Sequence, residues 1–555
     1  MTKLQQKNSP SSVVSDRILK VALWVMLAAF ILLVAAIRIR LLNFPLERDE
    51  GEYAYAGQLM LQGIPPYQLA YNMKLPGIYA AYAFIMAIFG QTVAGIHLGL
   101  LVVNVVTTVL VFFLAKRISD YFSAAIAASA FILLSVSPAL LGMAGHATHF
   151  VLLPAAAGLL ALLCALDRDK PSTLFLSGLL FGLAFLMKQQ GIFFGIFGGL
   201  YLIYSEARKR PASWTRLAER CSIYSTGAIL PFGITCLLLY RAGVFDTFWF
   251  WTVSYARQYV AIISPEAALQ SFSAGFAGVL NSGRVLWIFA GAGVVVLLRN
   301  WKIYRNSLFI MGLFLFSFLS ICPGFYFRQH YFILLLPAVA IAIGLVVSSA
   351  SRWLAAKNPR LSFIPILLFI MACGHAGYTH RNVLFFLSPQ EACRAVYGAN
   401  PFPEALKIAE YIKQHASKDA TIAVLGSEPE IFFYSGLKSS TGYIYTYGLM
   451  EPQPYAATMQ RQMTREIESA KPEYVVVVNI PTSWLAYPES DRFILDWINR
   501  YTKEKLELVG LIDILSETKT MYYWDLQEQN RSPQSQYFIA VYKRTPVSEA
   551  VKLPL

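Results

Sequence analysis

Long apolar runs separated by short polar segments dominate the first two thirds of the chain. The first run covers roughly residues 18–41 and follows a polar start that carries Lys3, Lys7 and Arg17. Crossing the ~30 Å hydrocarbon core of a bilayer takes about 20 helical residues. Eleven further runs follow, several of them shorter than that: 77–90, 95–115, 121–140, 147–166, 172–187, 191–204, 222–243, 284–298, 306–321, 331–350 and 361–379. The pattern predicts a polytopic α-helical membrane protein with 11–13 transmembrane helices.

The pattern changes at about residue 391, where charged residues return and apolar runs shorten to strand length. Runs of β-branched and aromatic residues predict strands, and helical spacing predicts helices between them. The strands are expected at 422–425, 474–478 and 538–541, and the helices at 405–414 and 461–470. We therefore expect a transmembrane module over 1–390, with an outward first loop over 43–75, and a soluble α/β domain over 391–555.

The composition supports a membrane protein with some soluble mass attached. Hydrophobic residues make up 56% of the chain and charged residues only 14%, against about 25% charged residues in ordinary globular proteins. The mean hydropathy is +0.51. These values exclude a purely soluble multidomain protein and a disordered chain.

The net charge of +14 falls mostly in short loops between the apolar runs. In such loops basic residues set the orientation of a membrane protein, so the excess does not indicate nucleic-acid binding. The basic loops expected in the cytoplasm are 116–117, 168–170, 208–220, 299–305 and 352–360. The first loop and the 391–555 domain would then lie on the outer side of the cell membrane. Counting one crossing per run gives the wrong parity, so either 77–90 or the interrupted stretch 172–204 is not a simple crossing.

The first loop holds four carboxylates within six residues, namely Glu47, Asp49, Glu50 and Glu52. One interpretation is structural: Asp49 caps a helix over 50–62, Glu52 completes a capping box, and the helix lies on the membrane surface. The other is that a carboxylate here takes the proton of an acceptor hydroxyl as a general base. Both can hold together, because a cap would fix the base in position.

Several cations near helix ends could bind a phosphate group. Lys74 stands at the start of the next apolar run, Lys188 interrupts 172–204, and Arg328 precedes His330 and Tyr331. A fixed cation stabilises the negative charge that grows on a leaving phosphate. The alternative for each is a side chain that reaches toward lipid headgroups, flanked in the case of Arg328 by interfacial aromatic residues.

Other polar groups carry weaker signals. His146 and His149 are three residues apart and could share a helix face, but two histidines without a third ligand are a poor metal site. Glu428 and Glu430 follow a predicted strand, where a solvated loop is the favoured interpretation. The segment 244–283 is either a flexible substrate loop or an amphipathic segment.

Four motifs occur in a fixed order along residues 20–350. They are Arg48-Asp49-Glu50-Gly51-Glu52-Tyr53-Ala54, Lys74-Leu75-Pro76, the stretch 182–191, and Arg328-Gln329-His330-Tyr331 leading into Leu335-Leu336-Pro337. The ordered set resembles the GT-C class of polytopic glycosyltransferases, in the branch of the protein O-mannosyltransferases and lipid A aminoarabinose transferases. Two positions depart from that pattern: Leu75 replaces a second proline, and residues 145–149 lack the acidic residue often found there.

The resemblance implies inverting transfer of a sugar from a polyprenyl-phosphate donor to a hydroxyl of a glycan, lipid or protein acceptor outside the cytoplasm. It implies Asp49 and Glu50 as catalytic residues. The expected ligands of the donor phosphate are Lys74, Arg328, Lys188, His330 and Tyr331, and the expected substrate contacts are Glu52, Tyr53, His146 and His149. No cofactor is predicted, and a divalent metal is left open.

Two other functions fit a polytopic chain. A lipid or solute transporter would need ionisable residues near the bilayer midplane or related halves with broken helices. The sequence has no clear internal repeat, and its charges cluster at helix ends. A non-catalytic subunit of a glycan assembly system is the other alternative. The ordered motifs favour the enzyme.

Overall fold

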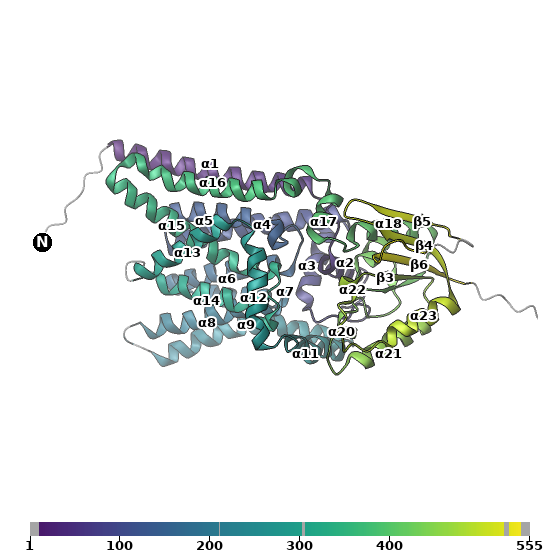
Figure 1. Ribbon diagram of the computed structural model, residues 1–555. Coiled ribbons are helices and arrows are strands. Elements are labelled where there is room, and N and C mark those ends of the chain that lie inside the picture. Colours follow the sequence, from purple (N-terminus) through teal and green to yellow (C-terminus); the bar gives the residue numbers. More distant parts are fainter. Residues whose placement is uncertain (1–9, 210, 212, 302–305, 527–531, 546–555) are drawn as a thin grey trace, which may run out of the picture. The chain divides into compact units, whose positions relative to one another are not determined.

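The computed structural model describes residues 10–209, 211, 213–301, 306–526 and 532–545 (Figure 1). The chain forms two compact units, each assembled from separate stretches. The first comprises Met1–Leu42, His97–Ile234 and Pro265–Phe386, and the second comprises Asn43–Ile96, Thr235–Ser264 and Leu387–Leu555. The residues 391–555 thus share a unit with two stretches of the preceding chain. Their predicted separation from residues 1–390 as a soluble domain stays a prediction.

The first unit is built from apolar helices, and all of them except the one at Pro265–Leu280 follow the predicted runs. In chain order they are α1 (Pro10–Arg40), α4 (Val93–Ile118), α5 (Tyr121–Leu134), α6 (Ala147–Arg168), α7 (Pro171–Met187), α8 (Ile192–Ala207), α9 (Trp214–Arg241), α12 (Pro265–Leu280), α13 (Arg284–Arg299), α14 (Ser307–Ile321), α15 (Leu336–Lys357) and α16 (Ile364–Thr379). A short 3-10 helix, Gln329–Leu335, leads into α15. The break predicted at Lys188 is confirmed, since α7 ends at Met187 and Lys188 is extended.

Helix α15 lies at the centre of this unit. It packs against α5 and α13, and its residues from Leu336 to Leu345 are all buried. A Cβ at Gly344 would stand 2.3 Å from the Ser123 carbonyl oxygen, so the missing side chain lets α15 approach α5 closely. Ser123 and Ser348 add a buried hydroxyl–hydroxyl hydrogen bond of 2.7 Å between the same helices.

The chain is a multi-pass membrane protein. Among the described residues, six helices are long and apolar enough to cross a bilayer: Lys20–Arg40, Val93–Ile118, Ala147–Arg168, Trp214–Arg241, Gln329–Lys357 and Pro359–Thr379. The bent pair α12–α13, with an angle of 113°, makes a seventh span if it counts as one. The predicted 11–13 spans are reached only with the shorter apolar helices Pro76–Phe89, Tyr121–Leu134, Pro171–Met187 and Ser307–Ile321. The segment 244–283 is mostly helical, with α10 (Phe245–Trp249), α11 (Ala256–Val260) and α12.

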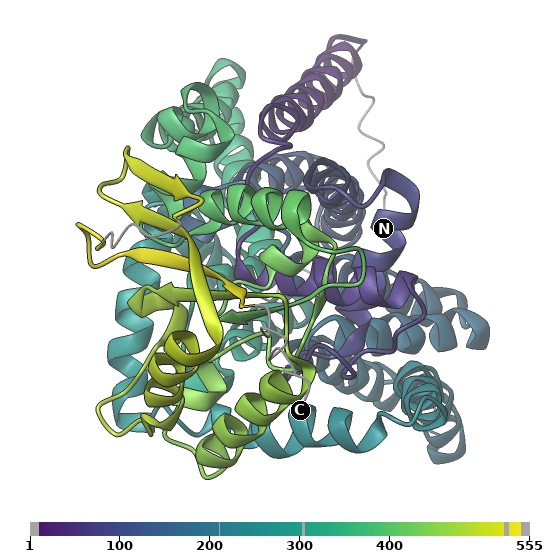
Figure 2. The same cartoon turned by 90° about the vertical axis from the view of Figure 1, so that its right-hand side faces the viewer.

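The second unit carries a six-stranded mixed sheet, which confirms the predicted α/β character. Its strands are β1 (Thr421–Leu425), β2 (Lys438–Ser439), β3 (Tyr474–Asn479), β4 (Leu506–Ile514), β5 (Thr520–Trp524) and β6 (Phe538–Arg544). The order is β2-β1-β3-β6-β4-β5, with β1 parallel to β2 and β3 and the remaining pairs antiparallel. In Figure 2 the yellow arrows are the C-terminal strands, and β6 enters the sheet between β3 and β4.

The helices of this unit precede the sheet or pack beside it. They are α2 (Arg48–Leu61), α3 (Pro76–Phe89), α10, α11, α17 (Pro389–Tyr397), α18 (Phe402–His415), α19 (Glu430–Ser435), α20 (Tyr447–Met450), α21 (Ala456–Ala470), α22 (Pro481–Trp484) and α23 (Phe493–Lys505). Helices α21 and α23 share a core with β1 and β3, and Tyr411 of α18 stacks on Trp524 of β5. Figure 1 shows α21 and α23 on one side of the sheet and α18 on the other. Helix α2 packs on α3 and α19.

Candidate active site

Helix α2 places the acidic cluster of the first loop. Glu47 is its N-cap, and the Glu47 carboxylate accepts a hydrogen bond of 3.0 Å from the Glu50 backbone N–H. The prediction that Asp49 caps the helix is therefore wrong, because the helix begins at Arg48 and Asp49 lies in its first turn. The predicted amphipathic pattern is also wrong, since α2 is buried on nearly all sides between Arg48 and Leu59 and has no broad exposed face. Because Asp49 does not cap the helix, its carboxylate can contact side chains of other segments.

Asp49 and Lys74 form an ion pair at the start of α2. Lys74 Nζ donates to Asp49 Oδ1 at 2.8 Å and to the Tyr53 hydroxyl at 3.2 Å. The Asp49 side chain is 20% exposed and the Lys74 side chain 13% exposed. The same ammonium lies 5.0 Å from the centroid of the Tyr53 ring. The site thus offers a partly open carboxylate beside a fixed cation.

Glu52 is the buried partner of Lys74. Its carboxylate accepts hydrogen bonds from the Tyr79 hydroxyl at 2.5 Å and from Asn72 Nδ2 at 2.9 Å, and it lies 3.5 Å from Lys74 Nζ. Burial raises the pKa of Glu52, the positive charge of Lys74 opposes this, and the result is a pKa of about 7. Glu52 therefore changes its charge near neutral pH.

Lys74 remains a cation over the whole physiological range. Burial by itself lowers the pKa of Lys74, but the carboxylates of Asp49 and Glu52 outweigh burial and hold that pKa well above its usual value. A cation already flanked by two acids is permanently charged and fixed in place, as binding of an anionic ligand requires.

The backbone at Lys74 is fixed by the residues that follow it. Leu75 is the N-cap of α3 with an extended conformation, as expected for a residue before proline, and Pro76 is the first helical residue. The Tyr67 hydroxyl donates to the Lys74 carbonyl at 2.7 Å. Leu75, one of the two departures noted in the sequence, is buried.

Arg48 anchors the N-terminus of α2 to the segment after β1. Its guanidinium donates to the Ser427 carbonyl at 2.5 Å and to the Glu428 carboxylate at 3.0 Å, and Ser483 Oγ donates to the other Glu428 oxygen at 2.7 Å. Glu428 and Glu430 are fully buried. The favoured solvated-loop interpretation of these two acids is therefore wrong. Burial, and then the neighbouring Glu428 carboxylate, raise the pKa of Glu430 well above its usual value.

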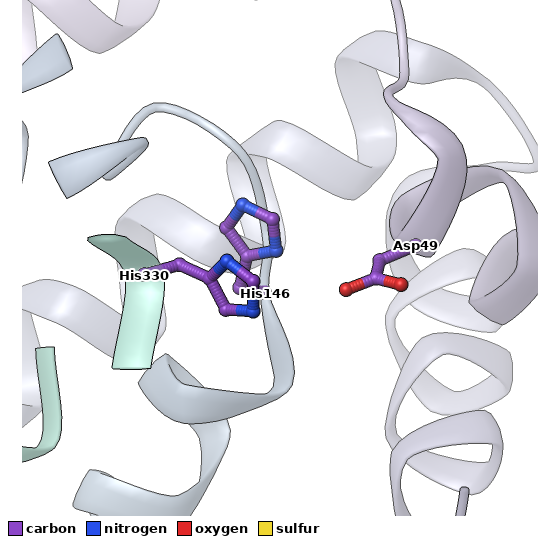
Figure 3. A group of neighbouring side chains, drawn as sticks. All are labelled: Asp49, His146 and His330. Atoms are coloured by element: carbon purple, nitrogen blue, oxygen red, sulfur yellow. The ribbon is translucent and has the colours of Figure 1, made fainter. Parts of the chain in front are cut away.

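Further predicted site residues meet within the first unit. The rings of His146 and His330 stack with centroids 4.1 Å apart (Figure 3), and Lys188 Nζ lies 4.2 Å from the centroid of the Tyr331 ring. The Cζ atom of Arg328 lies 5.3 Å from the centroid of the Tyr326 ring. Figure 3 also labels Asp49, which belongs to α2 of the second unit.

His146 and His149 take different surroundings although they are three residues apart. His146 is the N-cap of α6, and His149 is buried in the first turn of that helix.

Arg38 was not predicted as a polar group of the interior. It is buried near the end of α1 and donates to the carbonyls of Ser135, Gly142 and Met143 at 3.2, 2.8 and 3.4 Å. Its only signal was an arginine inside an apolar run.

A cavity of about 1030 Å³ in the first unit is lined by none of the predicted site residues. Its charged lining is already paired, Arg352 with Asp120 at 2.5 Å and Arg117 with Asp167. These are exposed ion pairs between helix ends, which contribute little to stability individually.

The fold is that of the GT-C class of membrane glycosyltransferases, as predicted. The family described as dolichyl-phosphate-mannose-protein mannosyltransferase matches residues 74–219. No curated protein matches the sequence.

Two solved structures illustrate the shared fold. ArnT from Cupriavidus metallidurans, bound to undecaprenyl phosphate, superposes with a TM-score of 0.59 at 14% identity, over 94% of this chain and 98% of that one. The archaeal oligosaccharyltransferase AglB from Archaeoglobus fulgidus, in complex with an inhibitory peptide and a dolichol-phosphate, gives a TM-score of 0.53 at 12% identity, over 91% of this chain and 74% of that one. At such identities the likeness concerns the fold.

Proposed function

We propose that the protein transfers a sugar from a polyprenyl-phosphate donor to an acceptor hydroxyl on the extracytoplasmic face of the cell membrane. The family match over residues 74–219 supports the chemistry. Two structures with the same fold hold undecaprenyl phosphate and dolichol-phosphate, which supports the lipid carrier. The acceptor is a glycan, a lipid or a protein, and membrane lipids surround the first unit.

The observation that carries the proposal is the partly exposed Asp49 carboxylate beside Lys74. In the reaction Asp49 takes the proton of the acceptor hydroxyl while that oxygen forms a bond to the anomeric carbon of the sugar. The bond from this carbon to the phosphate oxygen breaks, and the electron pair leaves with the phosphate. Lys74 stabilises the charge that develops there. Attack opposite the leaving group inverts the anomeric configuration.

The three neighbouring acids, Asp49, Glu50 and Glu52, differ in solvent exposure, and we infer that they therefore differ in role. Glu50 and Glu52 are both 0% exposed, whereas the Asp49 side chain is 20% exposed. An acceptor can reach Asp49, so we assign the base to Asp49 alone among them. Glu52 and Tyr53 hold Lys74 through the contacts described above and act on the substrate only through it. The donor-phosphate roles of Lys188, Arg328, His330 and Tyr331, and the substrate roles of His146 and His149, remain part of the proposal.

The test of the base is Asp49→Asn, which removes the proton acceptor and keeps the side-chain shape. In cells that lack the gene, the wild-type protein should restore a sugar on a surface glycan, lipid or protein, detected by mass spectrometry. We expect Asp49→Asn to lower the transfer rate by about 10²–10⁴-fold, the usual contribution of a general base. Glu50→Gln is the matched control and should retain transfer. Wild-type transfer by Asp49→Asn would disprove the assignment.

The test of the phosphate ligand is Lys74→Ala, measured by thermal unfolding with and without undecaprenyl phosphate. We expect this lipid to raise the melting temperature of the wild type and of Asp49→Asn, because a ligand that binds only the folded state stabilises it. The shift should be much smaller for Lys74→Ala and should return in part with Lys74→Arg. An equal shift in all four proteins would refute the role of Lys74.

A further inference from the structure

Asp49 has a second hydrogen-bond donor, and it comes from the C-terminal third of the chain. The Tyr445 hydroxyl donates to Asp49 Oδ1 at 3.2 Å, the oxygen that also accepts from Lys74. Tyr445 precedes α20 and is separated from Asp49 by 396 residues. Both residues belong to the second unit.

The backbone around Tyr445 is held by a network of buried hydroxyl groups. The next residue, Thr446, is fully buried; its N–H donates to Ser427 Oγ at 3.0 Å and its hydroxyl donates to the Ser483 carbonyl at 2.9 Å. Ser427 Oγ also donates to the Ser483 carbonyl at 2.6 Å. Hydrogen bonds thus join three chain segments next to Tyr445, and they fix the backbone that carries its phenol.

The same network also holds the residue next to Asp49. Arg48, the residue before Asp49, donates to the Ser427 carbonyl. The segments that carry Asp49 and Tyr445 are therefore both hydrogen-bonded to the same buried group, which consists of Ser427, Thr446 and Ser483. Burial, and then the Asp49 carboxylate, raise the pKa of Tyr445 well above its usual value, so the phenol stays protonated and donates.

We propose that Tyr445 is a positioning residue for the base, so that residues 391–555 complete the catalytic site. The proposal rests on the proposed function of Asp49. A donor to a carboxylate fixes the rotation of that carboxylate and favours its ionised form. Tyr445 therefore orients the Asp49 carboxylate toward the acceptor.

The test is Tyr445→Phe, which keeps the ring and removes the hydroxyl. Purified variants are added to detergent-solubilised membranes of cells that lack the gene, because these hold both unused donor and unmodified acceptor. Initial transfer rates are measured at pH 7, beside the thermal shift that undecaprenyl phosphate produces in each purified variant. Without the hydroxyl, the Asp49 carboxylate loses the donor that fixes its rotation, so we expect an approximately 10-fold lower transfer rate. The lipid should still raise the melting temperature of Tyr445→Phe as it does for the wild type, because Lys74 is unchanged.

Tyr443→Phe is the matched control from the same loop. The Tyr443 hydroxyl donates to Gln462 and has no part in the contact with Asp49, so its loss should leave both the transfer rate and the thermal shift unchanged. Thermal unfolding of each variant verifies folding. A wild-type rate for Tyr445→Phe, or a lower rate accompanied by loss of the thermal shift with undecaprenyl phosphate, overturns the proposal, whereas an inactive Asp49→Asn leaves the proposed function standing. Full activity of Asp49→Asn would instead refute the proposed function itself.

Discussion

Glu52 shows how one buried side chain sets the electrostatics of the site. Three donors, Tyr79, Asn72 and Lys74, favour its ionised form, yet burial keeps its pKa at about 7. Below that pH Lys74 faces one carboxylate charge, from Asp49, and above it faces two. The net charge offered to an anionic ligand therefore falls as the pH rises through neutrality.

The raised pKa of Glu52 predicts a pH dependence of stability. Between the ordinary value of 4.5 and about 7 the folded protein holds a proton that the unfolded chain has released. The stabilisation of the folded protein by this proton is therefore full below pH 4.5 and is lost as the pH rises through 7. The free energy of unfolding falls by about 3 kcal/mol in total. The melting temperature of the wild type should fall between pH 5 and pH 8 more steeply than that of Glu52→Gln. Identical slopes in the two proteins would show that Glu52 does not titrate in this range.

At the scale of the element, α2 depends on a close contact that its own sequence does not reveal. A Cβ at Gly51 would stand 2.6 Å from the Glu430 backbone nitrogen and 2.8 Å from its Cα. Backbone atoms cannot move aside as a flexible side chain can. The absence of a side chain at Gly51 thus lets the first turn of α2 pack directly on α19, and this contact fixes the direction in which Asp49 projects.

Gly51→Ala should therefore be strongly disruptive although alanine is the better helix former. Because the clash is with backbone atoms, we expect overpacking to cost up to about 3 kcal/mol, which outweighs the gain of about 1 kcal/mol in helix propensity. Transfer activity should fall as well, because Asp49 is two residues away. Gly374→Ala in α16 is the control: a Cβ there meets nothing within 4 Å, so that variant should be as stable as the wild type or slightly more. The measurement is thermal unfolding of both variants beside the wild type.

At the scale of the whole molecule, the sequence predicted what depends on local periodicity. Strand β3 was expected at 474–478 and spans Tyr474–Asn479, and the helix expected at 461–470 is α21 (Ala456–Ala470). Apolar spacing suffices for such elements because each buries one continuous face. The position of α2 was less well predicted. Local preference favours Asp49 as the N-cap, because aspartate is a strong capping residue and glutamate is not, yet the helix begins at Arg48 with Glu47 as its cap.

What the sequence could not predict are polar groups whose partners lie far along the chain. Glu428 looked like part of a solvated loop, but it is a buried group that contacts Arg48, 380 residues away, and Ser483. The site shares this property, since Lys74 and Tyr445 reach Asp49 from separate segments. Charge burial is decided by tertiary pairing, and a single sequence carries no sign of which charges will meet.

The Arg48–Glu428 pair offers the sharpest test of how the acidic loop is tied to the C-terminal segment. Both side chains are buried, so Arg48→Met leaves the Glu428 carboxylate without its cation at a cost of about 3–5 kcal/mol. Replacing both members, Arg48→Met with Glu428→Gln, removes the uncompensated charge. The double variant should therefore be more stable than Arg48→Met alone, measured by thermal unfolding. If the stability loss of the double variant instead equals the sum of the losses of Arg48→Met and Glu428→Gln measured singly, the pair does not couple these segments. The anchoring of α2 must then come from the packing of Gly51 on α19.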